Sequence, residues 1–258
     1  MRTLSLPSTI GADVFTVEQR DALGERVLAL AEQDSRVVAG AAVGSLAAGA
    51  GDRFSDLDLT FAVADDVDVA EVLDDWTRTL VEELSAVHLV DLVREPTIYR
   101  VFLLPGSLQF DLSMTPAARF APAGPRFRLL FGEIVESETR FPKPPAAADL
   151  FGWGVIYALH ARSCIERGRF WQAEHYVGAV RDHALSLACL HRDLPAAQAR
   201  GYDDLPAETL IGFDRTHVAA LEPEQLRKAL SEATRALLDE AAQADVPGVE
   251  GVAERMPD

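Results

Sequence analysis

The sequence predicts an α+β protein, in which a mixed β-sheet flanked by helices is followed by a bundle of helices. Three observations lead to this prediction. Short apolar runs typical of strands recur between residues 36 and 114, together with longer segments of helical spacing. The proline-rich stretch Phe141-Pro142-Lys143-Pro144-Pro145 then gives the composition of a linker. Beyond it the apolar residues keep helical spacing, so we expect helices there.

The expected elements follow from the period of the apolar residues. Helical spacing predicts helices over residues 17–34 and 68–85, and in the second half over 146–167, 171–191 and 224–242. Alternating or continuous apolar runs predict strands over residues 36–43, 57–63, 87–93, 98–104 and 108–114, the last two joined by a turn at Pro105-Gly106. We therefore predict a first domain over residues 1–142, a helical domain over 143–244, and an acidic flexible tail over 245–258.

The charge balance excludes some classes of function. The 258 residues include 24 Lys and Arg against 41 Asp and Glu, a formal net charge of −17. A nucleic-acid-binding protein needs basic side chains to neutralise phosphates, so we expect no nucleic-acid partner. The acidity would attract cationic ligands, or it serves only to keep the protein in solution. We also expect a cytoplasmic protein with no membrane partner, because no apolar run has the length of a membrane span and no signal peptide is evident.

Two aspartates stand in an unusual place in the first domain. Asp56 and Asp58 flank Leu57 at the start of a predicted strand. Residues two apart in a strand point to the same face, so both carboxylates can reach one point. Their mutual repulsion would be removed by a hard cation such as Mg²⁺, which binds carboxylates, phosphate oxygens and water. Asp111 lies in another strand-like run, L-Q-F-D-L-S-M, and is a third candidate ligand for one or two metal ions.

Gly44 and Ser45 directly follow the first predicted strand. A glycine there lets backbone N–H groups approach an anion closely, and the Ser45 hydroxyl adds a donor. The helix-prone residues that follow would direct a positive dipole end toward a phosphate. A phosphate cradle beside metal-binding carboxylates indicates a nucleoside triphosphate.

The spacing of these residues resembles a known family. Gly44-Ser45, ten intervening residues and Asp56-Leu57-Asp58, with Asp111 on a later strand, is similar to the pattern of the polymerase-β-like nucleotidyltransferase superfamily. The layout, a catalytic sheet followed by helices, resembles the antibiotic nucleotidyltransferases. The resemblance implies that the first domain is a nucleotidyltransferase domain. It further implies Mg²⁺, a nucleoside triphosphate donor, and transfer of a nucleoside monophosphate with release of pyrophosphate.

Two residues of the loop before the aspartates are further candidates. Arg53 could neutralise a triphosphate oxygen, or it could be a solvated loop charge. Ser55 could bind a carboxylate or the nucleotide, although capping of the turn is the simpler interpretation. Asp52 fits a surface loop.

The second domain holds candidates for binding the acceptor. Trp171, Glu174, Gly178 and Arg181 share one helical stripe. By analogy with the antibiotic enzymes, Glu174 is a candidate catalytic acid, and Trp171, Glu174 and Asp182 are candidate substrate-binding residues. The alternative is that Trp171 packs in the core and Glu174 pairs with a nearby arginine.

Four other residues of the second domain have simpler interpretations. Tyr157 and His160 are weaker candidates, for which core positions are favoured. Arg169 and His175 match the R-x5-H motif of helical toxin nucleases, a motif easily met by chance.

The sequence thus predicts a Mg²⁺-dependent nucleotidyltransferase that moves a nucleoside monophosphate, expected to be AMP from ATP, to a hydroxyl of a small molecule. A cationic, aminoglycoside-like antibiotic suits the acidic chain best. Two alternatives stay open. One is an enzyme of the toxin–antitoxin type that modifies a protein or a tRNA, and the other is a nucleotide sensor without catalysis. A homodimer is possible with any of them.

Overall fold

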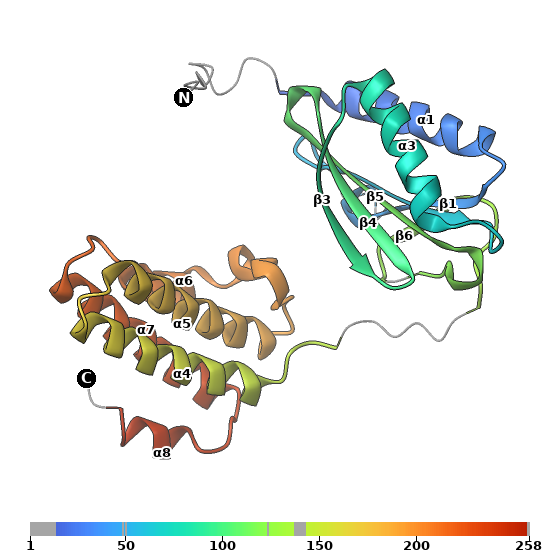
Figure 1. The fold of residues 1–258 in the computed structure, drawn as a ribbon. Helices are drawn as coiled ribbons and strands as arrows, with labels where there is room; N and C mark the ends of the chain where they lie inside the picture. The colour runs from blue at the N-terminus through green and yellow to red at the C-terminus, as the bar shows by residue number, and fades with distance from the viewer. Residues whose placement is uncertain (1–13, 48, 50, 123, 137–142, 257–258) are drawn as a thin grey trace, which may run out of the picture. The chain divides into compact units, whose positions relative to one another are not determined.

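The computed structural model describes residues 14–47, 49, 51–122, 124–136 and 143–256. The chain divides into two compact units, residues 1–141 and 142–258 (Figure 1). Residues 141 and 142 of the proline-rich stretch, and with them the predicted domain boundary, lie outside the described residues. Within the described part of the chain, no helix is both long and apolar enough to cross a membrane.

The first unit contains a six-stranded sheet with helices, and the sequence predicts five of its strands. Its helices are α1 (Val17–Gln33), the single turn α2 (Gly44–Ala47) and α3 (Val69–Leu84). Its strands are β1 (Val37–Val43), β2 (Leu57–Val63), β3 (Val87–Arg94), β4 (Thr97–Leu104), β5 (Leu108–Pro116) and β6 (Phe127–Phe131). Of these, β6 was not predicted.

The strands form one mixed sheet in the order β3-β4-β5-β2-β1-β6. All neighbouring pairs are antiparallel except β2 and β5, which are parallel and lie at the centre. The α+β class with a mixed sheet flanked by helices is therefore confirmed. The parallel pair requires a crossover, which α3, β3 and β4 supply.

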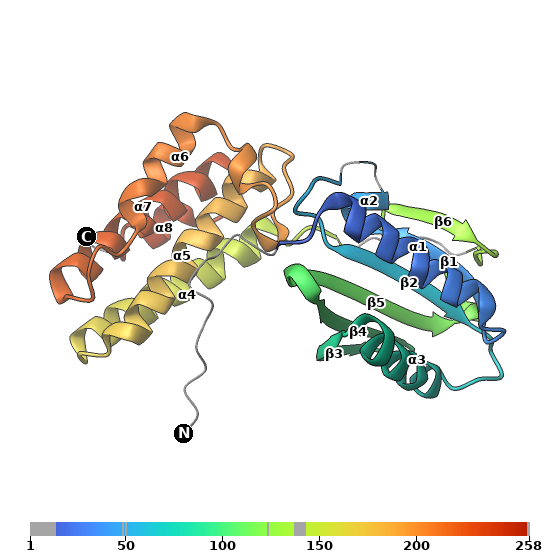
Figure 2. The same cartoon turned by 90° about the horizontal axis from the view of Figure 1, so that it is seen from above.

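Helices α1 and α3 cover one face of this sheet (Figure 2). The main core lies between them, and Phe61, Phe102, Phe110, Leu73 and Leu80 are among its fully buried side chains. Both helices start at capping residues. The Thr16 hydroxyl accepts from the Gln19 N–H, and the Asp68 carboxylate accepts from two N–H groups of the first turn of α3.

The opposite face of the sheet is more open. Side chains alternate between the two faces, so Phe110 and Leu112 of β5 enter the core while Gln109 and Asp111 point to the open face. Near β1, Phe120 packs on this face in a small apolar cluster. The open face carries the site described below.

The second unit is a bundle of helices, also as predicted. Its long helices are α4 (Ala147–Glu166), α5 (Phe170–Leu190) and α7 (Pro223–Gln243), with the shorter α6 (Ala207–Phe213) and α8 (Val249–Ala253). Leu187, Leu237 and Ala233 are fully buried in the bundle core. Gly154 permits close packing of α4 and α7, because a Cβ there would lie 2.7 Å from both methyl carbons of Leu237.

The predicted flexible tail is corrected by the structure. Residues 249–253 form α8, and Val246 is buried. Val249, Val252 and Met256 pack against the core of the bundle. The prediction was based on the acidic composition of the segment, whereas its apolar residues at helical spacing give it a face that can be buried.

Candidate active site

Three carboxylates gather on the open face of the sheet. Asp56 precedes β2, Asp58 lies in β2 and Asp111 lies in β5. One carboxylate oxygen of each lies within 4.8 Å of those of the other two, and all three residues are half-buried. The structure therefore brings together the three aspartates that the sequence singled out.

The parallel pairing of β2 and β5 explains this convergence. Asp58 is the register partner of Asp111, so their side chains stand next to each other on one face. Neighbouring strands are about 5 Å apart, which places two such carboxylates within reach of one ion. Asp56 lies two residues before Asp58 and completes the cluster.

The electrostatics of the cluster favour a cation. Burial raises the pKa of Asp111, and the neighbouring charge of Asp56 raises it further. Gln109 acts in the opposite direction by donating a hydrogen bond of 2.9 Å to Asp111 Oδ1. A bound divalent cation would offset the repulsion among the carboxylates.

Gly44 is required by the packing around Asp58. It has a positive φ of 71°, and a Cβ at this position would overlap Asp58 Oδ2 and lie 3.1 Å from Asp58 Cγ. Only glycine lets the backbone at the end of β1 approach the carboxylate this closely. The end of β1 and the carboxylates therefore form one local site.

Ser45 holds an unsatisfied hydroxyl beside this contact. Among the described side chains, its Oγ is the buried polar atom without a hydrogen-bond partner. Leaving a buried polar atom unpaired costs about 1–3 kcal/mol, so such an atom needs a ligand or another explanation. The helix that we expected to follow is only the four-residue α2, so its dipole contributes little to binding an anion.

These residues fit a metal ion with a phosphate group. The oxygen ligands Asp56, Asp58 and Asp111 suit Mg²⁺, which prefers carboxylates and keeps the rest of its ligands as water or phosphate oxygens. The Ser45 hydroxyl could donate to a phosphate oxygen.

The loop before Asp56 has its own internal order. The Asp52 carboxylate accepts from the Phe54 N–H, and Ser55 Oγ lies 3.1 Å from Asp52 Oδ1. The Ser55 hydroxyl is thus used within the turn, as the simpler interpretation expected. Arg53 stacks over the exposed ring of Phe54, at 4.6 Å from its centroid. The predicted nucleotide contacts of Arg53 and Ser55 stay predictions.

Arg20 is a residue of this site that the sequence did not reveal. Although charged, it is buried in α1, and one of its guanidinium nitrogens, Nη1, donates to the carbonyl oxygens of Asp52 at 2.6 Å and Ser55 at 3.3 Å. Asp21 accepts from its other nitrogens. Arg20 therefore holds the turn that leads directly into Asp56. No local motif indicates a contact over more than 30 residues.

The predicted acceptor residues of the second unit lie on α5. Trp171 is 80% exposed, so the alternative of a core tryptophan is wrong. Glu174 is half-buried and Asp182 is exposed. Their predicted roles toward an acceptor stay predictions.

The neighbouring aromatic residues of α4 and α5 form a connected cluster. Tyr157 contacts Trp153, Tyr176 and His183, with ring centroids 5.2–5.9 Å apart. His160 contacts Tyr176 as well and is exposed, so the favoured core position is wrong for His160. Arg169 precedes α5 and His175 is exposed on it, also against Tyr176.

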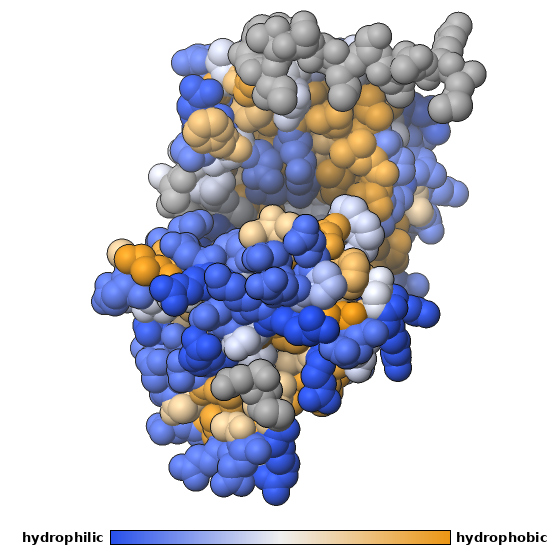
Figure 3. Space-filling view, turned by 90° about the vertical axis from the view of Figure 1, so that its left-hand side faces the viewer, coloured by the Kyte–Doolittle hydropathy of each residue, from blue (hydrophilic) through white to orange (hydrophobic). Residues whose placement is uncertain are grey.

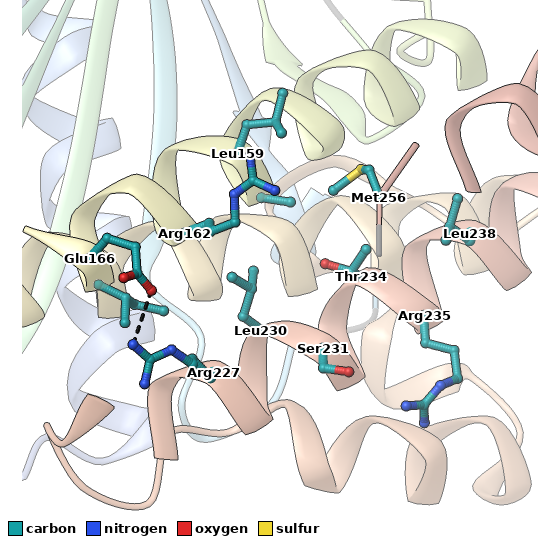
Figure 4. Close-up of a pocket in the computed structure, with 12 residues that line it drawn as sticks. Leu159, Arg162, Glu166, Arg227, Leu230, Ser231, Thr234, Arg235, Leu238 and Met256 are labelled. Atoms are coloured by element: carbon teal, nitrogen blue, oxygen red, sulfur yellow. Dashed lines mark hydrogen bonds and ion pairs between the residues drawn. The ribbon is translucent and has the colours of Figure 1, made fainter. Parts of the chain in front are cut away.

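A pocket of about 310 Å³ lies between α4 and α7 of the second unit (Figure 4). Leucines and isoleucine form its apolar part, and Arg227 at its edge pairs with Glu166 at 3.0 Å. Trp171, Glu174 and Asp182 are not among its lining residues. The pocket is therefore separate from the predicted acceptor residues.

Comparison with known proteins finds similarity among solved structures. Protein-family models give no match, and curated proteins give none either. Among solved structures, an aminoglycoside 6-adenyltransferase from Bacillus subtilis is 13% identical, with a TM-score of 0.42, over 94% of this chain and 97% of that chain. Similarity at this level does not establish a shared fold or activity.

Proposed function

We propose that the chain is a Mg²⁺-dependent nucleotidyltransferase that moves a nucleoside monophosphate from a nucleoside triphosphate to a hydroxyl group. The observation that carries this proposal is the cluster of Asp56, Asp58 and Asp111 beside Gly44 and the unsatisfied hydroxyl of Ser45. A cluster of acids alone is common without a metal. The buried hydroxyl of Ser45 beside the cluster has no hydrogen-bond partner within the described residues, so it favours an anion as a second ligand.

Each residue has a role in this proposal. Asp56, Asp58 and Asp111 would hold the metal, which when bound offsets the charge of the triphosphate. The hydroxyl of Ser45 donates to a phosphate oxygen, while Gly44 leaves room for the chain to turn around Asp58. Asp111 has a raised pKa and is the carboxylate best suited to take the proton of the attacking hydroxyl if it is not a metal ligand.

The donor and acceptor are narrower parts of the proposal. We propose ATP as the donor and a small hydroxylated molecule of the antibiotic type as the acceptor. The net charge of −17 argues against a nucleic-acid acceptor. Cytoplasmic location and a role in antibiotic resistance go with this acceptor and stay proposals, as does a homodimer.

The test is pyrophosphate release with Mg²⁺ and each nucleoside triphosphate, over a panel of hydroxylated antibiotics and simple alcohols. We expect release that needs one donor and one acceptor class and is lost in Asp58→Asn, with the fold checked by circular dichroism. Full turnover in Asp58→Asn would refute the proposal. Binding of ATP without release on any acceptor would indicate a sensor, and labelling of a macromolecule from α-labelled ATP would indicate a protein or tRNA acceptor.

Ser45→Ala gives an independent test. Because the hydroxyl is unsatisfied in the protein alone, its removal is expected to leave the free energy of unfolding unchanged or slightly higher. The same variant is expected to bind ATP about tenfold more weakly, since a hydrogen bond to a charged group contributes about 1.5–3 kcal/mol. Reduced stability together with unchanged ATP binding would contradict this role.

A further inference from the structure

An apolar surface adjoins the carboxylates on the open face of the sheet. It is formed by the outer strands β3 and β4, and we call it the apolar shelf: Val87, Val90, Leu92, Tyr99, Val101 and Leu103. Val87, Val90 and Leu92 are each 50–56% exposed, and none of the six side chains is charged. On the face of the molecule drawn in Figure 3, orange hydrophobic residues gather among blue hydrophilic ones. A contiguous exposed apolar surface on a soluble domain marks a contact with something else.

The strand register connects the shelf to the metal-binding residues. Asp58 pairs with Asp111, Asp111 with Val101, and Val101 with Val90. These four residues form one row across four strands on the same face. Val101 and Val90 are thus about 5 and 10 Å from Asp111 along the sheet, at one and two strand spacings. A molecule bound at the carboxylates that extends toward the edge of the sheet must lie on the shelf.

The order of the strands indicates that the molecule lying on the shelf is the acceptor and not the donor. Gly44 and Ser45 follow β1, which lies on the far side of the carboxylates from β4 and β3. In the proposed function Ser45 contacts the phosphates of the donor, so these phosphates lie on the β1 side. Attacking and leaving groups in phosphoryl transfer lie roughly in line on opposite sides of the reacting phosphorus. The attacking hydroxyl therefore comes from the side of the shelf.

We propose that the shelf binds the apolar body of the acceptor, so that the acceptor is an amphipathic hydroxyl compound and not a polycation. This inference rests on the proposed function and narrows its acceptor. A polycationic aminoglycoside would gain nothing from six uncharged side chains, whereas a molecule that pairs a hydroxylated ring with an alkyl or aromatic group covers them. Val90 and Leu92, on the outer strand β3 of the shelf, are specificity-determining residues.

The structure offers a matched pair of variants. Val90 and Val93 are the same residue type on the same edge strand, 56% and 58% exposed. Val93 is on the other face, because its register partner Ile98 packs against the main core. Val90→Ser and Val93→Ser therefore remove the same side chain with the same effect on strand propensity, but only the first alters the shelf.

The experiment measures pyrophosphate release with ATP and Mg²⁺ on two probes, lincomycin as the amphipathic acceptor and kanamycin as the polycation. We expect release with lincomycin, with its KM raised about tenfold in Val90→Ser. The KM for ATP should stay unchanged in that variant, and all constants should stay unchanged in Val93→Ser. Release with kanamycin alone, release with neither probe, or equal effects of the two variants would overturn the proposal.

Other occupants of the shelf give different results, and each overturns the proposal. A raised KM for ATP in Val90→Ser would place the donor's base on the shelf. A change of sedimentation in that variant alone would indicate a second copy of the chain, and a lower unfolding temperature in that variant alone would indicate packing by another part of the chain. Failure of the proposed function itself is distinguishable, because the wild-type protein would then release no pyrophosphate with any acceptor of the whole panel, whereas failure of this inference alone leaves release with an acceptor other than the amphipathic probe.

Discussion

Gly44→Ala tests whether the close contact at the end of β1 shapes the proposed metal site. The added Cβ would overlap Asp58 Oδ2, so the carboxylate or the backbone must move by about 1 Å to restore a normal contact. Alanine also has to adopt the positive φ of 71°. The substitution therefore combines backbone strain with displacement of one proposed metal ligand.

The two effects have different sizes. A non-glycine residue in the left-handed region costs about 1–2 kcal/mol, which lowers the unfolding temperature of a unit of this size by about 3 °C. Misplacement of a reacting group by about 1 Å costs about 100-fold in rate. We therefore expect a small loss of stability and a large loss of Mn²⁺ affinity and pyrophosphate release.

Gly168→Ala separates the two effects. Gly168 has nearly the same φ, 69°, but a Cβ there would meet nothing within 4 Å. This variant should show a similar loss of stability and unchanged metal binding. Calorimetric titration with Mn²⁺ and thermal unfolding of both variants provide the comparison. Equal Mn²⁺ affinity in the two variants would show that the contact between Gly44 and Asp58 does not shape the site.

Three further substitutions have outcomes set by charge. The pKa of Asp111 is raised in the folded protein, so its ionised form destabilises the fold increasingly as the pH rises from the unfolded to the folded pKa. Asp111→Asn is therefore expected to raise the free energy of unfolding of the metal-free protein at pH 7, measured by urea unfolding in EDTA. Hydrogen bonds from Arg36 lower the pKa of Asp34 to about 2, so Asp34 contributes stability above its unfolded pKa that is lost as the pH falls through about 2. Asp34→Asn should therefore lower the free energy of unfolding by roughly 1 kcal/mol at pH 7, after allowance for solvent screening, and leave it almost unchanged below pH 2. Arg20→Gln should lower both Mn²⁺ affinity and the unfolding free energy by about 2 kcal/mol through release of the turn before Asp56, whereas the exposed Arg26→Gln on the same helix should change neither.

Much of the first unit follows from local patterns in the sequence. The strand containing Asp58 alternates cleanly, and α3 has one apolar stripe between its cap at Asp68 and its end, so both are predictable. The edge strand β6 was missed because F-R-L-L-F is only five residues long and follows an irregular segment. Its pairing with β1, which no local pattern contains, makes it a strand.

The site was predictable by residue type and not by geometry. The pair Asp56 and Asp58 and the single Asp111 were identified because strand interiors seldom contain aspartate. The parallel register that joins them, and the reach of Arg20 to the turn, depend on contacts between residues far apart in the chain. The exposure of Val90 is equally invisible in the sequence, where β3 reads as an ordinary apolar strand.

The central parallel pair also has a consequence for folding. Asp58 and Asp111 meet only after the chain between them has formed a helix and a hairpin and returned to the sheet. Contacts of such long sequence separation form late and slow the folding of a domain. A nascent or partly folded chain therefore lacks the assembled cluster of carboxylates, so a cation bound at the proposed site would stabilise the finished sheet but would not nucleate it. Mg²⁺ should accordingly slow unfolding of this unit and leave its folding rate unchanged.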